Sequence, residues 1–156
     1  MDATKSIDVL NTLIEINNDR INGYETASKE AEETDLKTMF AKFTETSLKC
    51  KAELVAEVKR LGGKPTHETT TSGKFFRIWM DIKATISGKD RKAILSSCEF
   101  GEKAAVETYE KVLSDKIEYL TPKERIMITE QHLLIKADYA HVKKFHDKML
   151  ETKQHH

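Results

Sequence analysis

Four long segments of this chain repeat apolar residues three or four positions apart, and this spacing is the strongest constraint on its fold. The repeat matches the 3.6-residue turn of an α-helix, so each segment has one continuous apolar face. The segments span about residues 4–32, 35–61, 90–117 and 122–152. Such faces must be buried against one another, so the pattern predicts an all-α four-helix bundle in one domain, residues 1–153.

The ends of these segments carry their own signals. Thr34 precedes the second segment in a position typical of an N-cap residue. The sequence "LGGKP" after the same segment supplies a glycine for a left-handed turn, and Pro65 prevents the helix from continuing. At "TPKE", Thr121 caps the fourth segment, Pro122 takes the first helical position and Glu124 completes a predicted capping box.

The connection between the second and third segments is itself expected to contain a short fifth helix, over about residues 73–87 of "SGKFFRIWMDIKATISG". A helix of this length extends ~22 Å, which suits a crossover along the side of a bundle. Two helical hairpins joined by one long crossover make the ferritin-like arrangement. Phe75 and Trp79 on this helix either seal it onto the bundle or form the contact of a homodimer.

Composition and charge exclude several functional classes. The 156 residues include 26 basic and 26 acidic ones, so the chain lacks the positive surface that nucleic-acid binding requires. No basic cluster suits a membrane surface, and no apolar run approaches ~20 residues. The two cysteines form no disulfide framework, so a cytoplasmic location is expected. No phosphate-binding loop or nucleophile motif is present, so an enzymatic role is not favoured and no catalytic residue is predicted.

Polar side chains interrupt the centre of the apolar face in all four long segments. Burying a lone ionised carboxylate costs many kcal/mol, so a carboxylate in this position should be protonated, paired or bound to a metal. The interrupting residues are Asn17 in the first segment, Ser47 with Cys50 one turn on in the second, Glu102 in the third, and Asp138 with His141 one turn on in the fourth.

Glu102, Asp138 and His141 supply half of a metal-binding pattern known from helical bundles. In that pattern two helices each give a glutamate and the other two each give Glu-x-x-His. One interpretation is therefore a metalloprotein that holds one or two ions, of iron or another divalent metal, through these three residues. Glu99 and Tyr109 are candidate accessory residues.

The other half of the pattern is replaced by residues that cannot supply its carboxylates. A pair of metal ions needs several bridging carboxylates, whereas Asn17, Ser47 and Cys50 offer none, so no ferroxidase centre is expected. The second interpretation is a structural core. In it Glu102 hydrogen-bonds Tyr24, Asn17 or Ser47, and the acid of the fourth segment is protonated or linked through water. A Glu102→Gln change should then leave stability unchanged or raised.

The first and third segments share one further feature. A tyrosine follows the polar interruption by seven residues in both, as Asn17 and Tyr24 in one and Glu102 and Tyr109 in the other. This correspondence hints at an internal duplication of the hairpin.

Several stretches of the chain resemble a known family. "LIEINNDRINGYETA", "ELVAEVKRLGG", "GKFFRIWMDIKATISGKDRKAIL", "CEFGEKAAVETYEKVL" and "HDKM" are similar to an uncharacterised bacterial family of ferritin-like four-helix-bundle proteins, catalogued as a domain of unknown function. The resemblance covers about residues 10–149, and its most specific mark is R-x-W-x-D-x-K at 77–83. Family members typically read "CERGE" where Phe100 stands here, and often carry glutamine in place of Asp138.

The resemblance implies the ferritin-like fold with its crossover helix, and it implies no established activity. We therefore expect a small cytoplasmic binding or stress-associated protein without ferroxidase activity. A metalloprotein and a structural, dimerising bundle are the alternatives. His155 and His156 end the chain and are left out of the candidate site, because the sequence does not show whether they are native.

Overall fold

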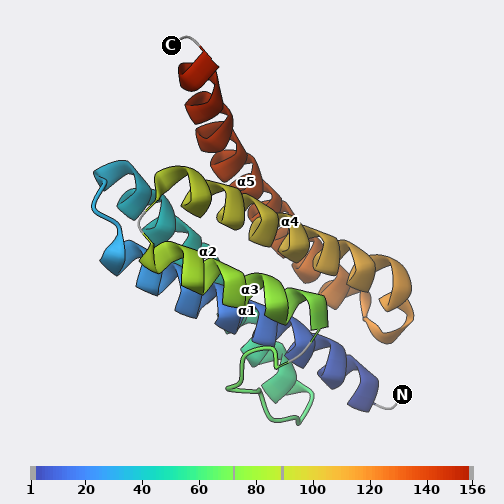
Figure 1. Ribbon diagram of the computed structural model, residues 1–156. Helices are drawn as coiled ribbons and strands as arrows, with labels where there is room; N and C mark the ends of the chain where they lie inside the picture. Colours follow the sequence, from blue (N-terminus) through green and yellow to red (C-terminus); the bar gives the residue numbers. More distant parts are fainter. Residues whose placement is uncertain (1–2, 72, 89, 155–156) are drawn as a thin grey trace.

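The computed structural model describes residues 3–71, 73–88 and 90–154, and its helices follow the predicted order (Figure 1). Each predicted boundary lies within two residues of the observed one. The predicted crossover helix is present as α3, and a short 3-10 helix, which was not predicted, precedes the last helix. The elements are α1 (Thr4–Glu30), α2 (Thr34–Arg60), α3 (Gly73–Ser87), α4 (Arg91–Asp115), η1 (Ile117–Tyr119) and α5 (Pro122–Gln154).

The helices form two hairpins with the crossover helix laid beside them. α1 packs along α2, and α4 packs along α5. α3 lies between α1 and α4, and α5 extends past the other helices at its C-terminal end (Figure 1). This is the predicted all-α, ferritin-like arrangement. None of the helices described by the structure carries an apolar stretch long enough to cross a membrane.

A polar layer divides the apolar core into two clusters. One cluster surrounds Tyr24, Phe40 and Trp79, near the turn from α1 to α2. The other surrounds Leu10 and Ile128, toward the opposite end of the bundle. The polar interruptions expected from the sequence lie between these clusters, so the helix periodicity placed them at the correct level of the bundle.

The crossover helix is held against the bundle by bulky residues that rest on glycines. The ring of Trp79 is 1 % exposed and packs edge-on to Tyr24, with ring centroids 5.2 Å apart. A Cβ atom added to Gly23 of α1 would lie 2.5 Å from Cζ3 of Trp79, and one added to Gly101 of α4 would lie 2.3 Å from Cδ1 of Ile82. Trp79 therefore seals α3 onto the bundle, which was one of its two expected roles.

The loop before α3 is anchored to the flank of α1. The loop leaves α2 through Gly62, whose φ of 83° is the left-handed turn expected from "LGGKP". Further along the loop, Asn18 donates a 2.8 Å hydrogen bond to the carbonyl of Glu68, and Thr70 donates from its hydroxyl to Asp19. These bonds satisfy buried polar groups of α1 and fix the point from which α3 starts.

The observed helix caps differ from the expected ones at one position. Glu33 has the extended backbone of an N-cap residue, so α2 begins at Thr34, and the prediction that Thr34 itself is the cap was wrong. The residue with the extended backbone is Glu33, one position before the Thr34 that the sequence indicated. The capping box of α5 is confirmed, because Thr121 N–H donates to Glu124 Oε1 at 2.9 Å and Glu124 N–H donates to Thr121 Oγ1 at 3.1 Å.

The packing of α3 leads to a first prediction. Gly23→Ala should destabilise the protein by about 1–2 kcal/mol in urea unfolding, because the new methyl group must displace the Trp79 ring. Asn22→Ala, at the exposed neighbouring position of the same helix, is the matched control and should stay within about 0.5 kcal/mol of the native protein. Equal stability of the two variants would show that the indole ring moves aside without cost.

Candidate functional site

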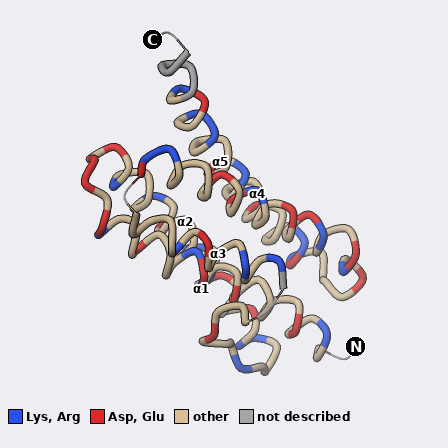
Figure 2. Tube along the Cα trace, in the orientation of Figure 1, with Lys and Arg blue, Asp and Glu red and all other residues tan. Residues whose placement is uncertain are grey.

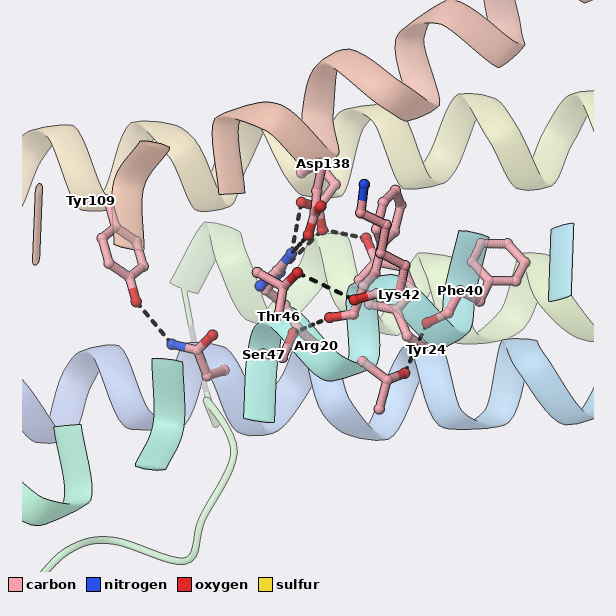
Figure 3. A network of polar contacts seen from close by, with 12 residues as sticks. Arg20, Tyr24, Phe40, Lys42, Thr46, Ser47, Tyr109 and Asp138 are labelled. Carbon is pink, nitrogen blue, oxygen red and sulfur yellow. Dashed lines mark hydrogen bonds and ion pairs between the residues drawn. The ribbon is translucent and has the colours of Figure 1, made fainter. Parts of the chain in front are cut away.

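An arginine that the sequence pattern did not single out lies at the centre of the polar layer. Arg20 on α1 donates from Nε to Glu102 Oε1 at 3.1 Å and from Nη2 to Glu102 Oε2 at 2.9 Å (Figure 3). The same Nη2 also lies 3.2 Å from Oδ2 of Asp138. The three side chains are at most 3 % exposed. One guanidinium therefore joins α1 to both helices of the second hairpin.

Two hydroxyl groups lie beside the acids. Tyr24, one turn after Arg20 on α1, donates a hydrogen bond to Oε1 of Glu102. Thr46 on α2 donates from its hydroxyl to the carbonyl of Lys42 at 3.2 Å, and its position lowers the pKa of Asp138. Residues of all four long helices therefore meet in the polar layer (Figure 3).

A second polar network lies beside the first. Asn17 donates from Nδ2 to the hydroxyl of Tyr109 at 2.9 Å, and that hydroxyl donates to Oε1 of Gln131 at 2.8 Å. Gln131 in turn donates to the carbonyl of Cys50 at 3.2 Å and to Glu53 Oε1 at 3.0 Å. This network also runs from α1 through α4 and α5 to α2, so it ties the two hairpins together a second time.

The hydrogen bonds between α1 and α4 are reciprocal. The polar residue of α1, Asn17, contacts the tyrosine of α4, Tyr109. The polar residue of α4, Glu102, contacts the tyrosine of α1, Tyr24. A two-fold relation between the hairpins would produce this pairing. The pairing also explains why a tyrosine follows the polar residue by seven positions in both helices.

Electrostatics inside the network favour a charged Arg20. Burial alone lowers the pKa of its guanidinium, but Glu102 and Asp138 outweigh that effect and hold the pKa above the usual range. Burial, together with the charge of Glu102, raises the pKa of Asp138 to about 6, although Arg20 opposes the shift. The network therefore contains a permanent cation and one acid that titrates near neutral pH.

The structure brings some of the predicted site residues together and separates others. Glu102 and Asp138 meet, but through Arg20 rather than directly. Of the three hydrogen-bond partners expected for Glu102, Tyr24 is observed. Ser47 donates instead to the carbonyl of Phe43 in its own helix, and Asn17 belongs to the neighbouring network.

The remaining candidates lie in other surroundings. The ring of His141 packs edge-on between Phe43 and Phe145, with centroids 5.8 and 5.0 Å away, and burial with nearby lysines lowers its pKa. Glu99 contacts Nδ1 of His146 at 2.7 Å. Tyr109 hydrogen-bonds amide side chains rather than a carboxylate.

Sequence reasoning missed two residues of these networks: Arg20 and Gln131. A helical wheel places Arg20 about 40° from the buried Tyr24, well inside the apolar face. The sequence signal that could have identified Arg20 was the pair of predicted buried acids, because carboxylates buried in a core need a cation or a proton. Gln131 lies between Ile128 and Ile135, which belong to a run of apolar residues spaced seven positions apart. That spacing gives no sign of a buried polar residue between them.

The family described as "Domain of unknown function (DUF2383)" matches residues 5–115. The chain belongs to this family. The match confirms the expected resemblance over α1 to α4, and it ends before α5, whereas the resemblance was expected to reach about residue 149.

A solved structure with the same fold comes from a protein of different sequence. It is described as a ferritin-like, diiron-carboxylate protein from Bacillus anthracis strain Ames, and the TM-score is 0.67 at 17 % identity. The alignment covers 96 % of this chain and 99 % of that one. At this identity the likeness establishes the ferritin-like fold alone. None of the curated proteins compared with this chain matches it.

The polar network does not fit a diiron centre of the kind named for that structure. Over residues 3–71, 73–88 and 90–154, no three His, Cys, Asp or Glu side chains form a group that could hold a metal ion. Arg20 is bonded to both acids, and a divalent ion ~4 Å from its charge would be repelled by roughly 8 kcal/mol. Metal binding by Glu102, Asp138 and His141 stays a prediction that the native arrangement does not favour.

Removing the charge of Glu102 should be strongly destabilising. Glu102→Gln leaves Arg20 buried without its bidentate partner, so the free energy of unfolding at about pH 7 should fall by roughly 3 kcal/mol in urea melts. This is the opposite of the result expected for a lone core acid. Glu107→Gln, at an exposed position of the same helix, should change stability by less than about 0.5 kcal/mol. A Glu102→Gln variant as stable as the native protein would contradict the ion pair.

The raised pKa of Asp138 makes stability depend on pH. Its folded pKa of about 6 exceeds the ordinary value of 3.8, so the group stabilises the fold below about pH 4, and this contribution is lost as the pH rises through 6. Asp138→Asn should therefore gain about 2–3 kcal/mol relative to the native protein between about pH 4 and pH 8 in urea melts. Asp147→Asn, exposed on the same helix, should follow the native curve. Parallel curves for the native protein and Asp138→Asn would refute the shift.

Proposed function

We propose that this chain is a ferritin-like bundle without ferroxidase activity that acts as a small cytoplasmic binding or stress-associated protein. In this proposal the buried polar network is structural. It holds the two hairpins in register and leaves binding to the outer surfaces of the helices.

The observation that carries the proposal is the position of Arg20. Its guanidinium is hydrogen-bonded to both core acids, at 2.9 to 3.2 Å, and so takes up the negative charge that a metal ion would need. The positions of the first hairpin that correspond to metal ligands hold Asn17 and Ser47, which carry no charge. A diiron oxidase requires several bridging carboxylates, and this core offers two that are already paired.

Other features support a role without catalysis. Burial raises the pKa of Cys50 to about 11 and raises that of Cys98 further, so neither thiol forms the reactive thiolate at neutral pH. Lysine and arginine alternate with aspartate and glutamate along the helices (Figure 2). A surface of mixed charge suits a protein or small-molecule partner better than nucleic acid or a membrane.

The two alternative functions make different demands on the same structure. A metalloprotein would require Glu102 and Asp138 to leave Arg20 and bind an ion with His141. A homodimer through the crossover helix would rest on Phe75, which is half-buried, because the ring of Trp79 is covered within its own chain. Concentration-dependent mass in analytical ultracentrifugation, lost on Phe75→Ala, would favour the dimer.

The proposal is tested by metal content and iron oxidation. The chain is purified without an added histidine tag from cells supplemented with iron and zinc, dialysed, and measured by elemental mass spectrometry. We expect well under about 0.1 metal equivalents per chain, and oxidation of ferrous iron no faster than in buffer. A diiron ferritin-like protein prepared in parallel provides the positive control.

The opposite result would have a clear signature. About one or two equivalents of metal that survive dialysis and disappear in Glu102→Ala would overturn the proposal and establish the metalloprotein. Metal that persists in Glu102→Ala but is lost when His155 and His156 are deleted would come from the end of the chain, and would leave the proposal standing.

A further inference from the structure

We infer that Glu102 and Asp138 form a binding site for a planar organic cation, which the guanidinium group of Arg20 fills in the native protein. Without that side chain, the site should bind a free guanidinium ion. The inference rests on the proposed function, because a metal ion between the two acids would displace the arginine.

The geometry of the acids matches a guanidinium. Both oxygens of Glu102 accept parallel hydrogen bonds from Nε and Nη2, which is the fork arrangement that a planar, delocalised cation makes. Asp138 accepts a third bond, from the same Nη2 at 3.2 Å. Three acceptor oxygens from two helices therefore surround one edge of the cation.

The side chains around the guanidinium also favour a planar cation. The guanidinium carbon of Arg20 lies 5.8 Å from the ring centroid of Tyr24, within the range of a cation–π contact. On α4, Ala105 follows Glu102 by three residues, about one helical turn, and is fully buried. Burial excludes the water that would otherwise solvate the acids, so an empty site would hold unpaired carboxylates at high cost.

The same geometry disfavours the competing cations. A divalent metal requires three or more ligands, and the described part of the chain presents no such group of His, Cys, Asp and Glu. A sodium ion makes no directed hydrogen bonds with the carboxylates. An ammonium group offers a point charge instead of a fork. The order of affinity should therefore be guanidinium first, with ammonium, sodium and divalent metal well behind.

The experiment removes the tethered cation and supplies a free one. Arg20→Ala is unfolded by heat, followed by circular dichroism, with and without about 50 mM guanidinium chloride. A site with a dissociation constant of about 5 mM would lower the unfolding equilibrium constant of the variant about tenfold. The native protein, whose site is filled, should show no stabilisation at the same concentration.

Two ligands and two variants serve as controls. Urea has nearly the shape of guanidinium without its charge, and sodium chloride at the same concentration matches the ionic strength, so neither should stabilise Arg20→Ala. Arg20→Met fills the space with an apolar chain and should not respond to guanidinium. Arg20→Ala combined with Glu102→Gln loses the fork and should not respond either.

A milder variant keeps the test decisive if Arg20→Ala does not fold. Arg20→Ala combined with Asp138→Asn buries one carboxylate instead of two, so it relieves most of the repulsion and keeps both oxygens of Glu102 for the fork. It should respond to guanidinium with a smaller but measurable rise in melting temperature, whereas Arg20→Met combined with Asp138→Asn should not respond.

The outcomes separate this inference from the proposed function. If guanidinium stabilises neither alanine variant, or stabilises no more than sodium chloride does, the inference is wrong even if the native protein is free of metal. If about 1 mM cobalt(II) stabilises Arg20→Ala and guanidinium does not, the acids form a metal site and the inference is also wrong. Metal that the native protein binds through Glu102, in contrast, would overturn the proposed function itself.

Discussion

The bidentate ion pair between Arg20 and Glu102, extended to Asp138, is the interaction on which the rest of this core depends. Removing three charged groups from water is expensive, and it is tolerated where the charges pair with and hydrogen-bond one another, although Nη1 of Arg20 has no hydrogen-bond partner among the described residues. Here one guanidinium on α1 reaches two acids on α4 and α5, so these bonds form only when the hairpins meet at one register. Apolar packing alone would allow the helices to slide by a turn. The ion pair removes that freedom, because each displaced register would leave a buried charge unpaired.

The two hairpins contribute different charges to the polar layer, the cation from the first and the acids from the second. Glu102 and Tyr109 each stand 85 residues after Asn17 and Tyr24, and the polar residue of each hairpin contacts the tyrosine of the other. By the same offset, the counterpart of Arg20 is Ala105, a small buried residue. An arginine on both hairpins would crowd the centre of the layer and add a second charge. An acid on both hairpins would leave more negative charge than one guanidinium can balance. Arginine on one hairpin and alanine at the corresponding position of the other fit the available space and keep the charges balanced.

How much of this was accessible from the sequence depends on what each signal measures. Apolar periodicity reports which face of a helix is buried, so it gave the helices, the crossover and the level of the polar layer. It does not report which partner a buried polar group finds. Glu102 was therefore predicted as a buried acid but its cation was not, because an arginine usually extends its charged end to solvent even from an apolar face. His141 illustrates the same limit. Its spacing from Asp138 is that of a ligand pair, yet its ring packs between Phe43 and Phe145.

The fold of this bundle does not determine the chemistry of its core. The bundle shares its backbone arrangement with a protein described as a diiron-carboxylate protein, and four helices that meet around a buried polar layer suit either kind of centre. Buried carboxylates need a positive charge to balance them. A metal ion supplies it from solution, under the control of metal concentration and redox state. An arginine supplies it through the chain itself, at fixed stoichiometry and without redox chemistry. In the function proposed for this chain, Arg20 on α1, together with the uncharged Asn17 and Ser47, makes the core a permanent cross-link.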